Sequence, residues 1–154
     1  MTQTEAQSLI QVLKKLLQHG SIILPQIGNQ TTLELRSVFS DKDRFTVIFN
    51  RRGKIRNDKY TLLLRYGKDK GLIRIDVGGP VHTNPDGTII PCPHIHLQQK
   101  NTGAWDAWAT DIPAVFGDVT DRLETFRAFL QYCNVNDLAS IEICEQSEMR
   151  GEND

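Results

Sequence analysis

Three of the four histidines in the chain lie close together in the sequence, because His82, His94 and His96 fall within one stretch of fifteen residues. Histidine can both donate and accept a proton near neutral pH, and its ring nitrogens also bind transition metals. His94 and His96 alternate along a strand-like segment, so both rings should point to the same face of a sheet. Acid–base catalysis and metal binding are therefore the two chemistries that this cluster could support.

An acidic residue is expected beside these rings. The segment 84–87, Asn-Pro-Asp-Gly, is typical of a tight turn, because proline presets the backbone angle at its second position. Counting back across this turn places His94 and His96 opposite residues 75–77. Arg74 and Asp76 alternate with isoleucines and should occupy the same polar face as the histidines. The sequence thus predicts a wet, polar surface on one side of the sheet.

The acid–base interpretation makes the imidazoles of His94 and His96 the proton donor and acceptor, with one ring oriented by a carboxylate. Such a site suits metal-independent cleavage of RNA, in which a 2′-hydroxyl attacks its own phosphodiester. An arginine would bind the phosphate. The predicted catalytic residues are His94, His96, Asp76 and His82, and the arginines considered for the phosphate are Arg65 and Arg74.

Other interpretations of the same residues remain open. His82, His94 and His96 with either Asp76 or Cys92 could bind a divalent transition metal, although an H-x-H spacing is less specific than paired C-x-x-C motifs. The histidines could instead bond to the backbone and simply complete a sheet. A noncatalytic module could use this face to hold a protein or a nucleic acid. The favoured prediction includes neither a metal nor another cofactor.

A second group of basic residues lies in a glycine-containing hairpin tip. Arg51, Arg52 and Lys54 are followed by two further cations, with only Asp58 in opposition. The formal net charge of the chain is -1, so contact with a nucleic acid would need such a local patch. Arg51, Arg52 and Lys54 are therefore candidate substrate-binding residues, and a solvated turn is the alternative.

The pattern of apolar residues predicts an α+β fold. A helix is expected over residues 3–19, with Lys14 on its polar face, and a second helix over 119–133, capped by Asp118. Between them the apolar period changes to two. This change predicts a curved antiparallel sheet, a meander of about six or seven strands, packed by the N-terminal and C-terminal helices. The expected strands are 31–39, 44–50, 59–66, 71–77, 88–91 and 93–99, with a last strand near 141–144.

The overall composition is that of a globular protein. The chain has 154 residues, of which 39% are hydrophobic and 24% charged, and it reads as one domain over residues 1–145 with a polar, frayed tail over 146–154. Its three cysteines show no C-x-x-C spacing, which favours reduced thiols and a cytoplasmic location. No signal peptide or membrane-spanning segment is predicted.

The segment from Arg65 to His96 also resembles a known group of sequences. Its motifs R-I-D-V-G-G, H-T-N-P-D-G and P-H-I-H are similar to those of a small uncharacterised bacterial family found largely in Gram-positive and mobile-element genomes. More distantly, the strand around His94 and His96 resembles the H-x-H ending of TumE-type toxins. That resemblance implies a toxin that acts on RNA and is paired with an antitoxin protein.

Overall fold

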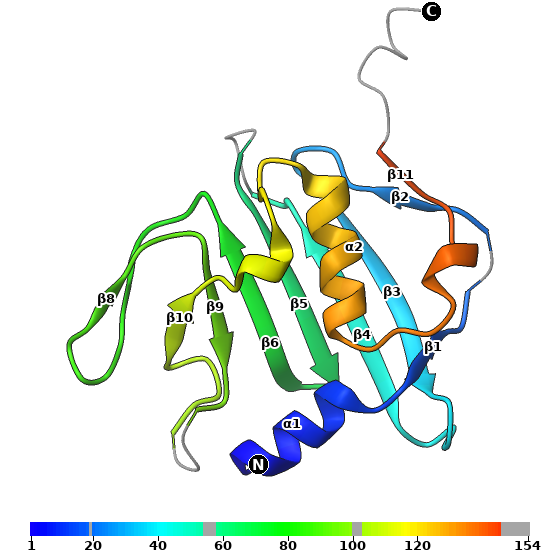
Figure 1. Cartoon of the computed structure of the whole chain (residues 1–154), viewed down its shortest axis with the longest axis horizontal. Coiled ribbons are helices and arrows are strands. Elements are labelled where there is room, and N and C mark those ends of the chain that lie inside the picture. The colour runs from blue at the N-terminus through cyan, green and yellow to red at the C-terminus, as the bar shows by residue number, and fades with distance from the viewer. Residues whose placement is uncertain (19, 54–57, 100–102, 146–154) are drawn as a thin grey trace, which may run out of the picture.

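A seven-stranded antiparallel sheet forms the centre of the molecule (Figure 1). The computed structural model describes the whole chain except residues 19, 54–57, 100–102 and 146–154, so the predictions for Lys54 and for the tail lie outside the described residues. The strand order is β1-β3-β4-β5-β6-β9-β10, and the sheet is open. The strands are β1 (Lys14–Leu16), β3 (Gln30–Ser37), β4 (Arg44–Asn50), β5 (Tyr60–Tyr66), β6 (Lys70–Val77), β9 (His94–Leu97) and β10 (Ala109–Asp111).

The predicted α+β class and the size of the sheet are confirmed. Strands β3 to β6 form the expected meander, because each pairs with the next one in the sequence. The chain then leaves the sheet to form a separate hairpin of β7 (His82–Thr83) and β8 (Ile89–Ile90), and it returns as β9 against β6. The predicted turn closes this hairpin, where the Gly87 amide donates to the Asn84 carbonyl at 2.9 Å.

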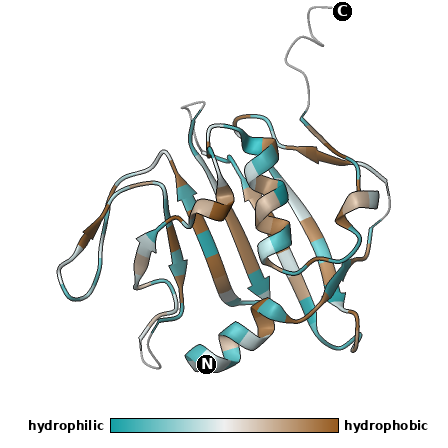
Figure 2. Cartoon of the chain, viewed as in Figure 1, coloured by the Kyte–Doolittle hydropathy of each residue, from teal (hydrophilic) through white to brown (hydrophobic). Residues whose placement is uncertain are grey.

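Two α-helices lie against one face of the sheet (Figure 1), and the apolar parts of both are brown in Figure 2. Apolar residues of both helices belong to the core. The two helices are α1 (Gln3–Gln11) and α2 (Arg122–Tyr132), and short 3-10 helices η1 (Ala114–Phe116) and η2 (Leu138–Ser140) flank α2. Ile10 of α1 and Phe126 and Phe129 of α2 are buried with the strand residues. A parallel pair of strands, β2 (Ile22–Leu24) and β11 (Ile143–Glu145), joins the two ends of the chain.

The N-terminal helix is shorter than predicted. It ends at Gln11, where Val12 becomes extended, and the chain continues into β1, which pairs with β3. Ladder hydrogen bonds to β3 override the helical spacing of the leucines, because tertiary pairing outweighs a weak intrinsic preference. Lys14 consequently faces the interior and is 0% exposed, so its prediction as a surface residue is wrong.

The C-terminal helix begins later than predicted. Asp121 is its N-cap, accepting from the Glu124 amide at 3.2 Å. Asp118, the predicted cap, instead accepts from the amide and the hydroxyl of Thr120 at 2.9 and 2.7 Å and closes a turn before the helix. Both residues are aspartates that bond a nearby backbone amide, which is why the sequence did not distinguish them. Among the described residues, no helix is long and apolar enough to cross a membrane.

Candidate active site

The register of β6 against β9 brings the predicted polar residues together. Asp76 lies directly opposite His94, and Arg74 lies directly opposite His96. Because side chains alternate along a strand, all four project from the same face of the sheet. The intervening isoleucines project into the core, where Ile75 is 0% exposed. The predicted shared polar face, with Asp76 beside the histidines, is confirmed, but the prediction that this face is wet is wrong at the two rings, because the His94 and His96 side chains are only 2% and 0% exposed.

One carboxylate oxygen is the centre of this cluster. Oδ2 of Asp76 lies 3.2 Å from Nε2 of His94 and 3.2 Å from Nε2 of His96. Arg74 contacts both carboxylate oxygens, with Nε 2.9 Å from Oδ1 and Nη2 3.2 Å from Oδ2. The Arg74 Nη2 atom also lies 3.1 Å from Nε2 of His96. Three nitrogen-bearing side chains therefore converge on Asp76.

Main-chain carbonyls fix the orientation of both rings. Nδ1 of His94 lies 3.2 Å from the Pro91 oxygen, and Nδ1 of His96 lies 2.9 Å from the Asp106 oxygen. A carbonyl can only accept, so Nδ1 carries the hydrogen in each ring. His94 also donates from Nε2 to Asp76 only when it is an imidazolium. His96 likewise donates from Nε2 to Asp76 only as an imidazolium, whereas its neutral ring would accept from Arg74 at Nε2.

The cluster strongly favours the charged form of Asp76. Burial alone would raise the pKa of this carboxyl group, but hydrogen bonds from His96 and Arg74, together with the charge of Arg74, hold the pKa well below its usual value of 3.8. Asp76 is thus a carboxylate at any pH near neutrality. A second carboxylate, Asp106, lies 3.3 Å from Nη1 of Arg74 and shares its positive charge.

His82 approaches the cluster from the hairpin rather than from the sheet. Its strand pairs with β8 and not with β9, yet its ring centroid lies 6.0 Å from that of His94 and 4.7 Å from that of His96. Nε2 of His82 lies 2.8 Å from the Ala107 oxygen, so Nε2 donates and Nδ1 of the neutral ring has a lone pair. All three clustered histidines therefore meet at one place.

Asn84 fastens this hairpin to the sheet. Its side-chain amide donates to the Ala109 oxygen at 3.0 Å, and its side-chain oxygen accepts from the Ala109 amide at 2.8 Å. These two bonds imitate the pairing of a strand residue, and they position His82 next to β9 and β10. The sequence marked Asn84 only as a turn residue, because the backbone that it reaches lies 25 residues away.

A cavity of about 410 Å³ opens over the cluster. Its lining combines basic, imidazole and carboxylate groups with a short apolar rim. The residues that line it are Lys59, Thr61, Arg74, Asp76, Val77, Gly79, Pro80, Val81, His82, His94 and His96. Thr61 and the nearby Asp106 were not predicted as site residues, and Lys59 was considered only as part of the basic group at the hairpin tip. The alternation of Thr61 with leucines on β5 indicated the polar face, but only the strand order places that strand beside β6.

The other predicted substrate-binding residues lie elsewhere. Arg65 is opposite Gly71, farther along β5, and does not line this cavity. Arg51 is 2% exposed and donates from Nη1 to the Pro25 oxygen at 3.0 Å, so the prediction that it binds substrate is wrong. Its aliphatic stem and guanidinium are covered where β4 meets the loop after β2. Arg52 is exposed, but it is not part of the lining of the cavity.

The donor set also has the composition of a metal site. One ligand atom from each of Asp76, His94 and His96 lies within 4.8 Å of the other two. Cys92 does not belong to this group, because its Sγ donates to the main-chain oxygen of Asp76 at 3.4 Å and burial raises the pKa of its thiol. Imidazole nitrogen and carboxylate oxygen together suit divalent transition metals.

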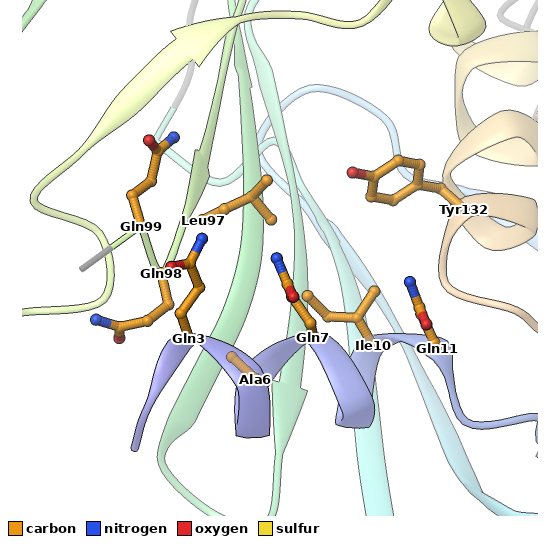
Figure 3. Close-up of a pocket in the computed structure, with 9 residues that line it drawn as sticks. All are labelled: Gln3, Ala6, Gln7, Ile10, Gln11, Leu97, Gln98, Gln99 and Tyr132. Atoms are coloured by element: carbon orange, nitrogen blue, oxygen red, sulfur yellow. The ribbon is translucent and has the colours of Figure 1, made fainter. Parts of the chain in front are cut away.

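A second cavity, of about 490 Å³, lies between α1 and β9 (Figure 3). Gln3, Gln7 and Gln11 are spaced by four residues along α1, and Gln98 and Gln99 follow β9. Of the residues that the structure describes, neither a charged group nor a histidine lines this cavity. It therefore offers hydrogen bonds but no group that could transfer a proton near neutral pH.

The chain belongs to DUF6978, a family of unknown function, whose model matches residues 1–135. The match includes the whole Asp76–His94–His96 cluster and the hairpin that carries His82. Neither the curated proteins nor the solved structures contain a match to this chain. The family therefore identifies the chain without indicating what it does.

Proposed function

For this member of DUF6978, we propose a metal-independent RNA hydrolase of the toxin type, with a histidine pair as general acid and base. The observation that carries the proposal is the meeting of three imidazoles, one carboxylate and one guanidinium at a cavity wall. Proton transfer by a positioned side chain contributes about 10²- to 10⁴-fold to a reaction rate. The cationic groups of Arg74 and Lys59 would bind the phosphate, because both line the same cavity.

The spacing of the rings suggests which pair acts across the substrate. The His94 and His96 rings lie edge to face with centroids 4.9 Å apart, and Asp76 Oδ2 lies between their Nε2 atoms. The His82 and His94 centroids are 6.0 Å apart, which leaves more room for a phosphate. We therefore assign the base to His82 and the acid to His94, with His96 and Asp76 as positioning residues.

In this mechanism, Nδ1 of His82 takes the proton of a ribose 2′-hydroxyl. The 2′-oxygen attacks the adjacent phosphorus, and the bond from phosphorus to the 5′-oxygen of the next nucleotide breaks. His94, oriented by Asp76 and the Pro91 carbonyl, acts in its protonated form and gives its Nε2 proton to that leaving oxygen. The products are a 2′,3′-cyclic phosphate, which water can then open, and a free 5′-hydroxyl.

Cleavage of a short single-stranded RNA by the purified chain, in the presence of EDTA, tests the proposal. We expect cleavage products that end in a 2′,3′-cyclic phosphate, and an at least 100-fold slower reaction for His82→Ala and for His94→Ala. His19→Ala, which changes the one histidine outside residues 82–96, is the matched control and should retain activity. A substrate with a single 2′-deoxyribose should be resistant at that position. Cleavage that survives both cluster substitutions would reject the assigned roles.

The toxin part of the proposal implies a protein partner that blocks the cavity. An antitoxin that binds over Lys59 and His82 would keep RNA from the cluster without changing the fold. Expression of the chain alone should arrest bacterial growth, and His94→Ala should relieve the arrest. If the chain is harmless when expressed and does not cleave RNA, the noncatalytic binding module becomes the better hypothesis.

A further inference from the structure

We propose that Asp76, His94 and His96 form a binding site for one divalent transition-metal ion, of the Zn²⁺ class, and that the ion competes with the guanidinium of Arg74. The ion would be held by Oδ2 of the carboxylate and by Nε2 of each ring. The binding part of this inference is independent of the proposed catalysis. A second part, that the ion inhibits RNA cleavage, rests on the proposed function.

Two of the three distances between the ligand atoms match those in a metal site, and the third, between the two Nε2 atoms, is within 4.8 Å. Bonds of 2.0–2.1 Å at angles between 90° and 109° require neighbouring ligand atoms to be roughly 2.9–3.4 Å apart. Both separations between Nε2 and Asp76 Oδ2 are 3.2 Å. An ion could therefore be accommodated with small shifts of side chains that the strand register already aligns. Further coordination positions would face the cavity, where water can enter.

The hydrogen bonds behind the two rings are those that metal-binding histidines make. A ligand histidine almost always donates from its other ring nitrogen to a carbonyl or carboxylate, which fixes the tautomer. Nδ1 of His94 and Nδ1 of His96 each face a main-chain oxygen, from Pro91 and from Asp106. Both neutral rings would consequently present an Nε2 lone pair toward Asp76. This shared orientation is an observation independent of the ligand distances.

Arg74 is the cation that would compete with the ion for these ligand atoms. Its Nη2 atom contacts His96 Nε2 at 3.1 Å and Asp76 Oδ2 at 3.2 Å, which are two of the three ligand atoms. An ion and the guanidinium cannot both use these lone pairs. The Arg74 side chain is 32% exposed and already contacts Asp106, so it can turn toward that carboxylate and leave the ligands. Arg74 should therefore weaken metal binding.

Metal binding and the proposed acid–base chemistry exclude one another. An ion on Nε2 of His94 takes the atom that would carry the proton for the leaving group. His82, which donates from Nε2 to Ala107, would remain a base but would have no acid partner. Zn²⁺ should accordingly inhibit cleavage in proportion to its occupancy of the site, and EDTA should restore the activity.

Titration of the purified full-length chain with Co²⁺, followed by visible absorption, tests binding without RNA. We expect one ion per chain, a visible spectrum without the sulfur-to-cobalt absorption of a thiolate site, and displacement by Zn²⁺. The affinity should fall at least about 100-fold in His96→Ala and in His94→Ala. His82→Ala, from the same cavity, is the matched control and should retain the native stoichiometry.

The decisive variant is Arg74→Gln, because unfolding cannot produce a gain of affinity. We expect it to bind Co²⁺ at least about 10-fold more tightly than the native chain, as removal of a competing cation requires. Failure of both the native chain and Arg74→Gln to bind Co²⁺ or Zn²⁺ would overturn the inference. So would equal binding by the His94→Ala and His96→Ala variants when circular dichroism shows them to be folded.

The binding and cleavage experiments separate the two proposals. Metal binding with no RNA cleavage under any condition would keep the metal site and reject the hydrolase. Cleavage in EDTA by a chain that binds no metal would keep the hydrolase and reject the metal site. Cleavage that Zn²⁺ leaves unchanged, at concentrations that saturate the Co²⁺ site in competition, would reject the regulatory part alone.

Discussion

Lys14, which is buried, and Asp76, which is half-buried, are two charged groups whose pKa values are lowered for opposite reasons. Burial lowers the pKa of Lys14 from 10.5 to about 8, which means that its surroundings disfavour the charge. Burial would raise the pKa of Asp76, but hydrogen bonds from His96 and Arg74 reverse this effect, which means that its surroundings favour the charge. The same direction of shift therefore reports a desolvated cation in one place and a well-paired anion in the other.

The surroundings of the two groups explain this difference. The Lys14 ammonium donates to the carbonyl oxygens of Ile10, Val12 and Cys133 at 2.6, 3.0 and 2.7 Å. These carbonyls lie at or just beyond the ends of α1 and α2, where helix dipoles are negative. These three carbonyls, which we call the Lys14 cage, provide one acceptor for each of the three ammonium hydrogens, and none of them is ionised. Asp76, in contrast, opens on a cavity that five other titratable or cationic side chains also line, namely Lys59, Arg74, His82, His94 and His96. The Lys14 cage is closed to solvent, so it can contribute only to the stability of the fold. The Asp76 cluster lines a cavity, so a ligand can reach its charged groups.

The largest expected effect on stability comes from removing the caged cation. Lys14→Ala leaves three buried carbonyls unsatisfied and creates a cavity, so the free energy of unfolding should fall by about 3–5 kcal/mol. Lys14→Met keeps most of the volume and should lose less. Urea denaturation measures both. A loss below about 1 kcal/mol for Lys14→Ala would show that the cage contributes little.

Asp76→Asn should change how the free energy of unfolding depends on pH in acid. The pKa of Asp76 is lower in the folded than in the unfolded chain, so its contribution is present above the unfolded pKa of 3.8 and is lost as pH falls toward the folded value. The native chain should lose on the order of 2 kcal/mol from this group between pH 5 and strong acid. Thermal unfolding at stepped pH should show a shallower decline for Asp76→Asn. Equal declines in both proteins would contradict the proposed pairing.

Gly71→Ala should displace Trp105 and, through it, the neighbouring Asp106 that contacts the cluster. A Cβ atom on Gly71 would lie 2.2 Å from the indole ring, so the ring must move. Trp105 precedes Asp106, which contacts both Arg74 and His96. We expect a loss of about 1–2 kcal/mol in the free energy of unfolding, a shift in tryptophan fluorescence and slower RNA cleavage. Gly103→Ala is a control, because a Cβ there meets open space and the strain is confined to its own backbone.

The smallest predicted effect is a change in the free energy of unfolding above pH 8, caused by Lys14. Since the Lys14 pKa is lower in the folded chain, the unfolded chain binds more protons between pH 8 and 10.5, and the free energy of unfolding should rise with pH there. We expect the free energy of unfolding to rise by about 1 kcal/mol between pH 8 and 9. Above pH 9 the buried Cys133 thiol, whose pKa is raised to about 12, acts in the opposite direction. Lys14→Met should lack the rise, and a rise that persists in this variant would reject Lys14 as its source.

The Asp76 cluster was largely predictable from local patterns. The period of two on β6 and β9 and the turn at 84–87 fix the face and the approximate register of Asp76 and His94. Lys14 was not predictable in the same way. Helical spacing of the leucines assigned it to a wet face, and only the pairing of β1 with β3 turned it inward. Arg51 was misplaced for a similar reason, because a charge near a glycine turn usually meets water.

The sequence by itself determined the α+β class, the meander of β3 to β6, and the common face of Arg74, Asp76, His94 and His96. These features depend on alternation and turn chemistry, which are local. Only the tertiary structure decided that His82 reaches the cluster from a separate hairpin, that Asp106 joins it, and that Lys14 is enclosed by the ends of two helices. These contacts join segments far apart in the chain, and no residue spacing specifies which distant backbone will supply a hydrogen-bond partner.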